Sequence, residues 1–377
     1  MTTPLSYIEL SKDNLLSNIN NIKSILPKNI GLGCVVKANA YGHGYAEIVN
    51  IIKSHVDYLL VDDFSEFKKI RNITDKPIIL LGYVSKDELL QTIELDGILA
   101  VYDIERLPLL DNLAHRLNKR VKIHIKIDAH LGRQGILVDA VEDFIVELKK
   151  YKNIAIDGVY AHFANIEDTS DVTHAEKQIS EYKRAIEIFQ RNGYDKIESH
   201  ISSTSGILAY EQKSGSSSLV RFGIGLYGLW PSEGLRNIYG KNGVTLKPVM
   251  RWITHVAQVK TLPANYPIGY GITFVTSKKT KIAIIPQGYS DGYDRSLSNV
   301  GEVLIHGTRC RVLGRVSMNI FTVDVTHLPD IKPEDEVVLL GQQDNEIISA
   351  EEIAQKINTI NYEVVARVSW DLPRTIV

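Results

Sequence analysis

The 377-residue sequence predicts a (β/α)8 barrel followed by a second, mostly antiparallel β domain. From residue 31 to about residue 225, eight short apolar runs alternate with amphipathic helical stretches. A helix between two strands returns the chain to the same sheet edge, so these strands are expected to run parallel. After Pro231 the alternation stops, and short strands separated by turns follow.

The predicted barrel strands are short apolar runs, rich in aliphatic residues. An open doubly wound sheet would show the same alternation, so the number of units is what favours a closed barrel. The strands are expected at residues 32–37, 58–62, 77–83, 97–102, 121–128, 157–163, 198–203 and 219–224. The helices are expected at residues 13–25, 46–54, 64–71, 86–95, 104–117, 141–150, 175–192 and 205–210.

The β domain is predicted from strands with little helical periodicity between them. We place the barrel at residues 11–235 and the β domain at residues 236–377, with residues 5–10 as a strand that could join the β domain. The strands are expected at residues 250–260, 281–286, 303–306, 310–316, 320–325 and 336–340, and the only helix at residues 350–356.

Composition narrows the class of protein. The 43 basic and 45 acidic residues nearly cancel, which argues against nucleic acid as a partner, because a phosphate backbone needs a concentrated positive face. No uncharged apolar run has the length of a membrane helix, and residues 1–6 lack the pattern of a signal peptide. Two cysteines, Cys34 and Cys310, are too few for a disulfide framework and lack metal-pair spacing. We therefore expect a cytoplasmic protein without a membrane or metal site.

Lys37 ends the first apolar run and precedes the segment Ala-Asn-Ala-Tyr-Gly-His-Gly at residues 38–44. Lysine is rarely buried, so its place at the end of a buried strand is unusual. An amine with a depressed pKa can form a Schiff base with a substrate or with pyridoxal phosphate. The alternative is a lysine whose stem lies on the strand end while its charge reaches water.

Further polar residues follow other strands at the same barrel end, where such barrels hold active sites. Each has an ordinary explanation taken alone, as a core histidine, a surface arginine or an N-cap threonine. Together at one mouth they favour an active site. These residues are Lys126, Arg133, His162, Ser203, Thr204 and Arg221.

A phosphate site is predicted after the seventh and eighth strands. The hydroxyls of Ser203 and Thr204 begin a helix beside the glycines of segment 223–225, and Tyr41 could add a third hydroxyl. A phosphate anchor opposite a Schiff-base lysine suggests pyridoxal phosphate. A Schiff-base aldolase acting on a phosphorylated sugar would need the same two features.

The segment Val-Val-Lys-Ala-Asn-Ala-Tyr-Gly-His-Gly at residues 35–44 resembles the cofactor-lysine signature of alanine racemases, the fold-type III pyridoxal-phosphate enzymes. The similarity extends over nearly the whole chain and includes the β domain. It is carried further by residues 126–128, 132–133, 162, 220–228, 269–271, 285–292, 314–319 and 361–363.

The resemblance implies an isomerase that interconverts L- and D-alanine, in the family setting of D-alanine biosynthesis for peptidoglycan precursors. Lys37 would carry the cofactor and act as one acid/base, and Tyr270 would act on the opposite face of the substrate Cα. Racemisation needs both, because a proton leaves one face and arrives on the other. Arg221 would face the pyridine nitrogen and, with His162, help the tyrosine to ionise.

The resemblance also implies the binding residues. Arg133 would bind the substrate carboxylate. It would be positioned by Lys126, which corresponds to a lysine that is often carbamylated in the family. The residues implied to hold the cofactor are Lys37, Tyr41, His162, Ser203, Thr204, Arg221, Gly223, Ile224 and Tyr362.

Residues of the β domain are implied at the substrate. Tyr289 would narrow the entrance, and Met318 and Asn319 would line the substrate site. Tyr270 and Met318 would reach the barrel of a partner subunit, so the resemblance implies a head-to-tail homodimer with shared active sites.

The chain departs from the family pattern at the substrate. It has Ser317-Met318-Asn319 where the family usually has a cysteine and an aspartate around the methionine, and Ser203-Thr204 where the family has asparagine-serine. Loss of a carboxylate at residue 319 could admit a polar side chain, so a serine or broad-specificity racemase is the alternative to an alanine racemase.

Two other classes share parts of this pattern. A fold-type III decarboxylase should show a cysteine-centred motif in the β domain, but Cys310 lies outside segment 316–319. A non-catalytic pyridoxal-phosphate-binding protein of similar fold would lack the β domain and therefore Tyr270. A barrel that only binds a ligand remains an alternative until activity is measured.

Overall fold

The computed structural model describes residues 4–211 and 217–377, so residues 1–3 of the segment assessed for a signal peptide lie outside the described residues. The chain forms two compact units. One comprises residues 16–38 and 48–247, and the other comprises residues 1–15, 39–47 and 248–377. The main boundary falls between Lys247 and Pro248, later in the chain than the predicted division after residue 235.

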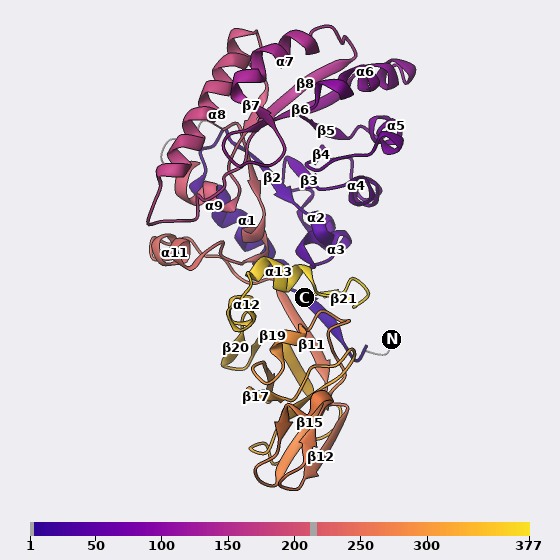
Figure 1. The fold of residues 1–377 in the computed structure, drawn as a ribbon, viewed down its shortest axis with the longest axis vertical. Helices are drawn as coiled ribbons and strands as arrows, with labels where there is room; N and C mark the ends of the chain where they lie inside the picture. The colour runs from indigo at the N-terminus through magenta and orange to yellow at the C-terminus, as the bar shows by residue number, and fades with distance from the viewer. Residues whose placement is uncertain (1–3, 212–216) are drawn as a thin grey trace. The chain divides into compact units, whose positions relative to one another are not determined.

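The first unit is a barrel of parallel strands with helices around it (Figure 1). Hydrogen-bonded neighbours follow the order β10-β2-β3-β4-β5-β6-β8-β9. The described barrel strands, β7 aside, are β2 (Gly31–Val35), β3 (Tyr58–Val61), β4 (Ile78–Leu80), β5 (Ile98–Val101), β6 (Val121–Asp128), β8 (Ile154–Tyr160), β9 (Glu198–His200) and β10 (Leu219–Phe222).

The barrel closes between β9 and β10 by backbone bonds from Ser218 N to Ser199 O and from Arg221 N to Ser202 O, both 2.9 Å. The predicted fold class is confirmed. Each barrel strand is buried on both faces, by helices outside and by side chains inside the barrel. Its sequence is therefore a nearly continuous apolar run, and such runs predicted the strands.

Helices lie between the strands of the barrel, and each predicted helix has a counterpart. The helix predicted at residues 205–210 is a short α-turn that continues as a π-helical turn at Ile207–Glu211. The helices are α1 (Lys12–Ile25), α3 (Tyr45–Ile52), α4 (Phe64–Arg71), α5 (Lys86–Glu94), α6 (Leu107–Arg116), α7 (Val141–Leu148), α8 (Thr173–Arg191), α9 (Thr204–Gly206) and α11 (Glu233–Leu235); the short strand β7 (Ile136–Leu137) pairs with β6.

The second unit is built on a mostly antiparallel sheet. The N-terminal strand β1 (Tyr7–Leu10) pairs antiparallel with β11 (Met250–His255) and parallel with β21 (Arg374–Ile376). The remaining elements are β12 (Gln258–Leu262), β13 (Pro267–Ile268), β14 (Phe274–Val275), β15 (Thr280–Ile285), β16 (Glu302–Ile305), β17 (Thr308–Leu313), β18 (Phe321–Asp324), β19 (Glu336–Gln343), β20 (Glu346–Ile348), α12 (Ala350–Ile357) and α13 (Asn361–Ala366).

Two predictions for this unit were wrong. The single strand expected at residues 250–260 is broken into β11 and β12, which pair with different strands, β19 and β15. A second helix, α13, follows α12 after Asn358, which caps α12 in the left-handed conformation with φ 56°. A helix of six residues is too short for its periodicity to be read from sequence.

A left-handed turn follows Lys37 directly. Element α2 (Lys37–Tyr41) contains four consecutive non-glycine residues, Ala38 to Tyr41, with φ between 51° and 54°. Each such residue costs roughly 1–2 kcal/mol relative to the right-handed form, and no sequence pattern predicted it. The turn ends at Gly42, with φ 78°, where a Cβ would collide with the carbonyl oxygen of Val365. Long-range packing therefore holds the backbone just beyond the lysine in a conformation that local preference opposes.

Within the described ranges, no helix combines the length and the apolar character needed to span a membrane.

Candidate active site

Lys37 lies just past the carboxyl end of β2, between the ends of β3 and β10. Strand register pairs Cys34 with Phe222 on one side and Val35 with Leu60 on the other. The Lys37 Nζ is 3.3 Å from Asp62 Oδ1, and its side chain is 40% exposed. The amine is therefore neither buried nor fully in water, but held at the rim of the barrel mouth.

The backbone around Lys37 is anchored by residues that the sequence did not single out. The Tyr227 hydroxyl donates to Val35 O over 2.8 Å. The carboxylate of Glu66 accepts from Ala38 N at 2.5 Å and from Asp62 N at 3.0 Å. Burial raises the pKa of Glu66, and the two backbone bonds oppose that rise. These contacts fix both the strand end and the turn beyond Lys37.

Arg221, on β10, has a buried guanidinium that donates in several directions. Its Nη2 donates to Ala161 O at 2.9 Å and to Ile201 O at 2.8 Å, and its Nη1 donates to His200 O at 3.1 Å. The same nitrogens reach His162 Nδ1 at 3.0 Å and His200 Nδ1 at 2.6 Å. Burial lowers the pKa of Arg221 to about 10, so the guanidinium remains protonated at neutral pH. It is a fixed cation, oriented by neutral acceptors.

The protonation of His162 follows from Arg221. Burial and the nearby Arg221, Arg133 and Lys126 cations hold the pKa of His162 well below its usual range, so the ring is neutral. Because Nδ1 accepts from the guanidinium, the ring proton must be on Nε2. His162 therefore offers an N–H donor from its other nitrogen.

The predicted phosphate segments meet through Thr204. Its hydroxyl oxygen accepts from the backbone N–H groups of Gly223 and Gly225, both at 3.2 Å, which ties the start of α9 to the segment after β10. A Cβ on Gly225 would lie 2.7 Å from the Thr204 methyl group, so glycine is required for this approach. Ser203 precedes α9 in extended conformation. The structure thus joins Ser203, Thr204, Gly223 and Ile224 in one backbone arrangement.

Lys126 and Arg133 form a second basic group at the end of β6. Lys126 is buried, and burial together with Arg133 and Arg221 lowers its pKa to about 8. The exposed Arg133 makes no hydrogen bond or ion pair within residues 4–211 and 217–377. A guanidinium without a carboxylate partner can bind a carboxylate ligand.

The sequence also missed Tyr160. Its ring stacks on His200 with centroids 4.9 Å apart, and Arg221 lies 5.5 Å from the ring centroid. The Lys126 Nζ lies 5.7 Å from the same ring. The Tyr160 ring is therefore a neighbour of both basic groups. No motif signalled this role.

In the second unit, Tyr270 follows Gly269 in a turn between β13 and β14 and is 74% exposed. Met318 is also exposed, at 56%. The segments of Tyr289 and Met318 are joined, because Tyr289 N donates to Ser317 O at 3.1 Å and the Asn319 amide donates to Ser290 Oγ at 2.8 Å. In this unit the rings of Tyr41 and Tyr362 have centroids 6.2 Å apart.

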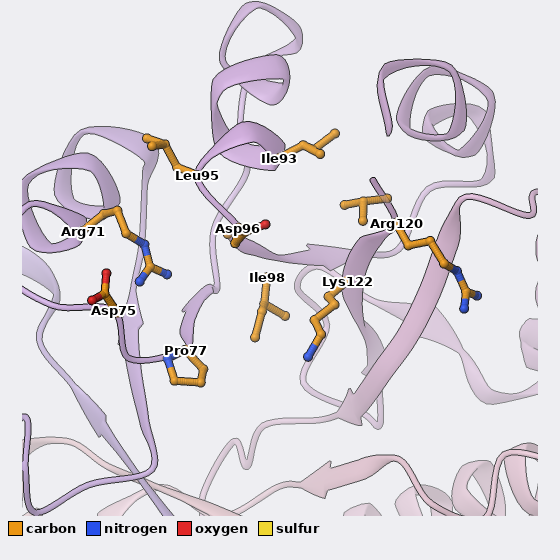
Figure 2. Close-up of a pocket in the computed structure, with 11 residues that line it drawn as sticks. Arg71, Asp75, Pro77, Ile93, Leu95, Asp96, Ile98, Arg120 and Lys122 are labelled. Carbon is orange, nitrogen blue, oxygen red and sulfur yellow. The ribbon is translucent and has the colours of Figure 1, made fainter. Parts of the chain in front are cut away.

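A pocket of about 340 Å³ lies at the other end of the barrel (Figure 2). Its wall includes Pro77, Ile98 and Lys122, which lie at or just before the amino ends of β4, β5 and β6. Active sites of (β/α)8 barrels lie at the carboxyl ends of the strands, so this pocket is not the candidate active site.

Two family models together match most of the chain. The model described as the alanine racemase N-terminal domain matches residues 10–231, and the alanine racemase C-terminal domain matches residues 249–376. An alanine racemase of Methanococcus maripaludis is 37% identical over 371 residues, covering 98% of this chain and 97% of the relative. An alanine racemase of Leptospira interrogans is 34% identical over 377 residues, covering 99% and 96%.

Solved structures similar to this chain are also alanine racemases. Alanine racemase from Clostridium difficile 630 has a TM-score of 0.93 and 32% identity, covering 100% of this chain and 97% of that one. A structure of alanine racemase from Bartonella henselae, described as having covalently bound pyridoxal phosphate, has a TM-score of 0.85 and 25% identity over 100% of both chains.

The fold and the strand-end residues define a (β/α)8-barrel protein with a basic, hydroxyl-containing site at its mouth and an antiparallel β unit. Within that class, the chain belongs to the alanine racemase family.

Proposed function

We propose that this protein is an alanine racemase that uses pyridoxal phosphate to interconvert L- and D-alanine. One observation carries the proposal. The partly exposed amine of Lys37 follows β2, and the neighbouring strand β10 holds the buried Arg221 cation. Family membership over 98% of the chain supports the same activity.

The donor set fits pyridoxal phosphate. Lys37 would supply an amine for the aldehyde, and Arg221 would supply a cation for the pyridine nitrogen. Ser203, Thr204 and the tightly approaching backbone of Gly223 and Ile224 suit a phosphate dianion. Tyr41 and Tyr362 are proposed to add hydroxyls to that phosphate site. When bound, the cofactor supplies an electron sink that makes the Cα proton of an amino acid removable.

The residues of the chain then move the proton. Lys37 would hold the cofactor, and its free amine would take or give a proton at one face of the substrate Cα. Tyr270 does the same at the other face, so both enantiomers can be formed. Because Tyr270 is 74% exposed in the single chain, we propose that it acts in the barrel mouth of a second subunit, within a homodimer.

Arg221 and His162 support this proton transfer. The His162 Nε2–H is left as a donor by the bond from Arg221 to Nδ1, and it can stabilise the phenolate of Tyr270. A permanently protonated Arg221 would also disfavour a proton on the pyridine nitrogen of a bound cofactor, since two positive charges repel.

Arg133 is proposed to bind the substrate carboxylate, and Lys126 to position Arg133. The pKa of about 8 leaves part of Lys126 as free amine at neutral pH, which is the form that reacts with carbon dioxide to give a carbamate. A carbamate would place a negative charge beside Arg133 and Arg221 and remove the buried positive charge. Tyr289, Met318 and Asn319 are proposed to border the substrate.

The test is to incubate the purified protein with L-alanine in deuterated water. Loss of optical rotation with deuterium at Cα is expected, and Lys37→Ala should abolish both the reaction and the absorbance band of the bound cofactor. Lys53→Ala is the matched control, because in the described part of the chain the Lys53 ammonium bonds to Asn50 and to the Ile73 carbonyl and to no residue of the site. A decarboxylated product, or full activity of Lys37→Ala, would refute the proposal.

Serine or broader racemisation is the second candidate, favoured by Asn319. Its neutral amide, hydrogen-bonded to Ser290, stands where the family usually has a carboxylate. Parallel reactions with L-serine and larger amino acids rank the substrates. We further propose a cytoplasmic location and a role in supplying D-alanine to peptidoglycan precursors, in keeping with the family.

A further inference from the structure

A line of buried polar side chains leads from Arg221 across the barrel interior. Arg221 Nη1 lies 2.6 Å from His200 Nδ1. The other nitrogen of that ring, His200 Nε2, lies 2.8 Å from His124 Nδ1 on β6. Both histidines have no exposed surface. None of the residues beyond Arg221 has a role in the proposed reaction, so their purpose requires explanation.

The Arg221 guanidinium, the first donor of this line, determines the tautomers of His200 and His124. A guanidinium can only donate, so His200 Nδ1 must accept and its proton must be on Nε2. That N–H donates to His124 Nδ1, which leaves the proton of His124 on Nε2. Burial and Arg221 also hold the pKa of His200 well below its usual range, which agrees with a neutral ring.

Asp157 ends the line. His124 Nε2 lies 3.4 Å from Asp157 Oδ2. Both atoms are buried, and neither makes a hydrogen bond in the described part of the chain, so the contact is electrostatic: the His124 ring nitrogen lies against the carboxylate without hydrogen-bond geometry. Asp157 Oδ1 pairs with Lys122 at 3.0 Å, and Lys122 also borders the pocket in Figure 2.

The backbone is shaped for this contact. The register between β6 and β8 slips at His124, since Ile123 pairs with Ile156 but His124 pairs with Gly158. Asp157 is the extra residue of that bulge, and bulges re-aim side chains. A Cβ on Gly158 would lie 2.5 Å from the His124 ring, so glycine leaves room for it. The bulge and Gly158 together show that the backbone accommodates the His124 side chain next to Asp157.

The line connects Arg221 to a carboxylate, Asp157, that it does not touch and that also pairs with Lys122. Its direct hydrogen-bond partners are backbone carbonyls and two neutral histidines, while the ionisable groups around it include Tyr160, Tyr182, Glu211 and Arg133. Glu211 and the two tyrosines favour the cation without a printed bond to it, and ordered N–H dipoles that lead toward a carboxylate add to this stabilisation of a buried charge.

We propose that Asp157, His124 and His200 are positioning residues that hold the Arg221 guanidinium protonated and in one orientation. This inference rests on the proposed function only where it concerns catalysis. Without Asp157, His124 can take its other tautomer, which allows His200 to turn an N–H toward Arg221 and displace it. Arg221 would then bond less well to His162 and oppose protonation of the pyridine nitrogen less effectively.

The first test uses the purified protein with ¹⁵N-labelled histidine, by NMR at neutral pH. His124, His200 and His162 should each show a protonated Nε2 and an unprotonated Nδ1, and Asp157→Asn should alter the signals of His124 and His200. A doubly protonated His200, or a proton on its Nδ1, would overturn the proposal. This measurement does not depend on racemase activity, so it tests the positioning role even if the proposed function is wrong.

The second test measures Asp157→Asn in the holoenzyme. We expect the kcat for alanine to fall about tenfold with little change in KM, and faster conversion of the cofactor to its amine form, seen by absorbance. Lys119→Met is the matched control, since it removes the Lys119–Asp96 ion pair at the same barrel end without touching the line. Unchanged kcat and cofactor spectrum in a folded Asp157→Asn protein would contradict the proposal; if the variant does not fold, the wild-type NMR result decides.

Discussion

Lys126 Nζ donates to Gln134 Oε1 over 3.0 Å, at the end of β6 where Arg133 also lies. No carboxylate forms an ion pair with this buried ammonium in the described part of the chain. Desolvation and the neighbouring arginines therefore lower its pKa to about 8. A buried ammonium without an ion pair lowers the stability of the folded protein, and its lowered pKa makes the free amine more available for reaction.

We predict that Lys126 is carbamylated in air-equilibrated buffer. With a pKa of about 8, roughly a tenth of the side chain is free amine at pH 7, several hundredfold more than for an ordinary lysine. Native mass spectrometry should show an added carbon dioxide that disappears in Lys126→Ala but not in Lys119→Ala. Removal of bicarbonate should raise the KM for alanine, because Arg133 loses its positioning charge. An unmodified protein with unchanged KM would contradict this.

The same pKa predicts a pH dependence of stability. Between pH 8 and 10.5 the unfolded chain still binds a proton at Lys126 that the folded, unmodified chain has lost. The free energy of unfolding should therefore rise with pH across that window, relative to Lys126→Met. Denaturant titrations in carbon-dioxide-free buffer measure the difference between the two proteins. Parallel curves in this buffer would contradict the lowered pKa of Lys126.

Tyr270→Phe should lower racemisation by about 10²–10⁴-fold while leaving the thermal midpoint unchanged, since the side chain is 74% exposed and makes no hydrogen bond within the described residues. Deuterium exchange at Cα of one enantiomer should persist, because Lys37 still serves its face. Tyr266→Phe, an exposed tyrosine before the same turn, is the control and should be near wild type. Equal loss of exchange from both enantiomers would argue against the assignment of two bases.

Asn319→Asp should shift the preference toward alanine. The Asn319 amide donates to Ser290 Oγ, whose own proton goes to Met318 O. A carboxylate would compete for that proton and place a charge beside the substrate, so the ratio of kcat/KM for serine to that for alanine should fall by about tenfold. Initial rates with both amino acids measure it. A higher ratio in the variant would exclude Asn319 as the residue that admits polar substrates.

Gly42→Ala should destabilise the protein by about 3 kcal/mol or more, because a positive φ is combined with a collision at the Val365 carbonyl. Gly193→Ala is the matched control: its φ of 87° is similar to the 78° of Gly42, but nothing lies within 4 Å of its Cβ. It should cost only about 1 kcal/mol. Denaturant titrations compare the free energies of unfolding of the two variants. Equal decreases would show that the collision of the added Cβ with the Val365 carbonyl has no cost.

Much of the site could be anticipated because its residues sit at strand ends. Lys37, Arg221, Thr204 and Lys126 follow or end apolar runs, and parallel strands bring their carboxyl ends to one mouth. The family resemblance then extended to nearly the whole chain, and the predicted family is confirmed. The roles assigned to individual residues remain predictions for the experiments above.

Other features could not be anticipated. His124, His200 and Asp157 are scattered over three strands and carry no motif, and only the register slip beside Gly158 brings them into line with Arg221. The left-handed turn at Ala38–Tyr41 runs against local preference, so propensity argues against it.

The sequence alone determined the order of elements, the barrel and the family, because apolar periodicity and short motifs are local properties of the chain. Tertiary structure alone decided the state of the charged groups. Burial lowers the pKa of Lys126, the acceptors around Arg221 set the tautomer of His162, and Glu66 anchors the backbone beyond Lys37. Such properties depend on desolvation and on contacts between distant segments, which exist only once the chain has folded.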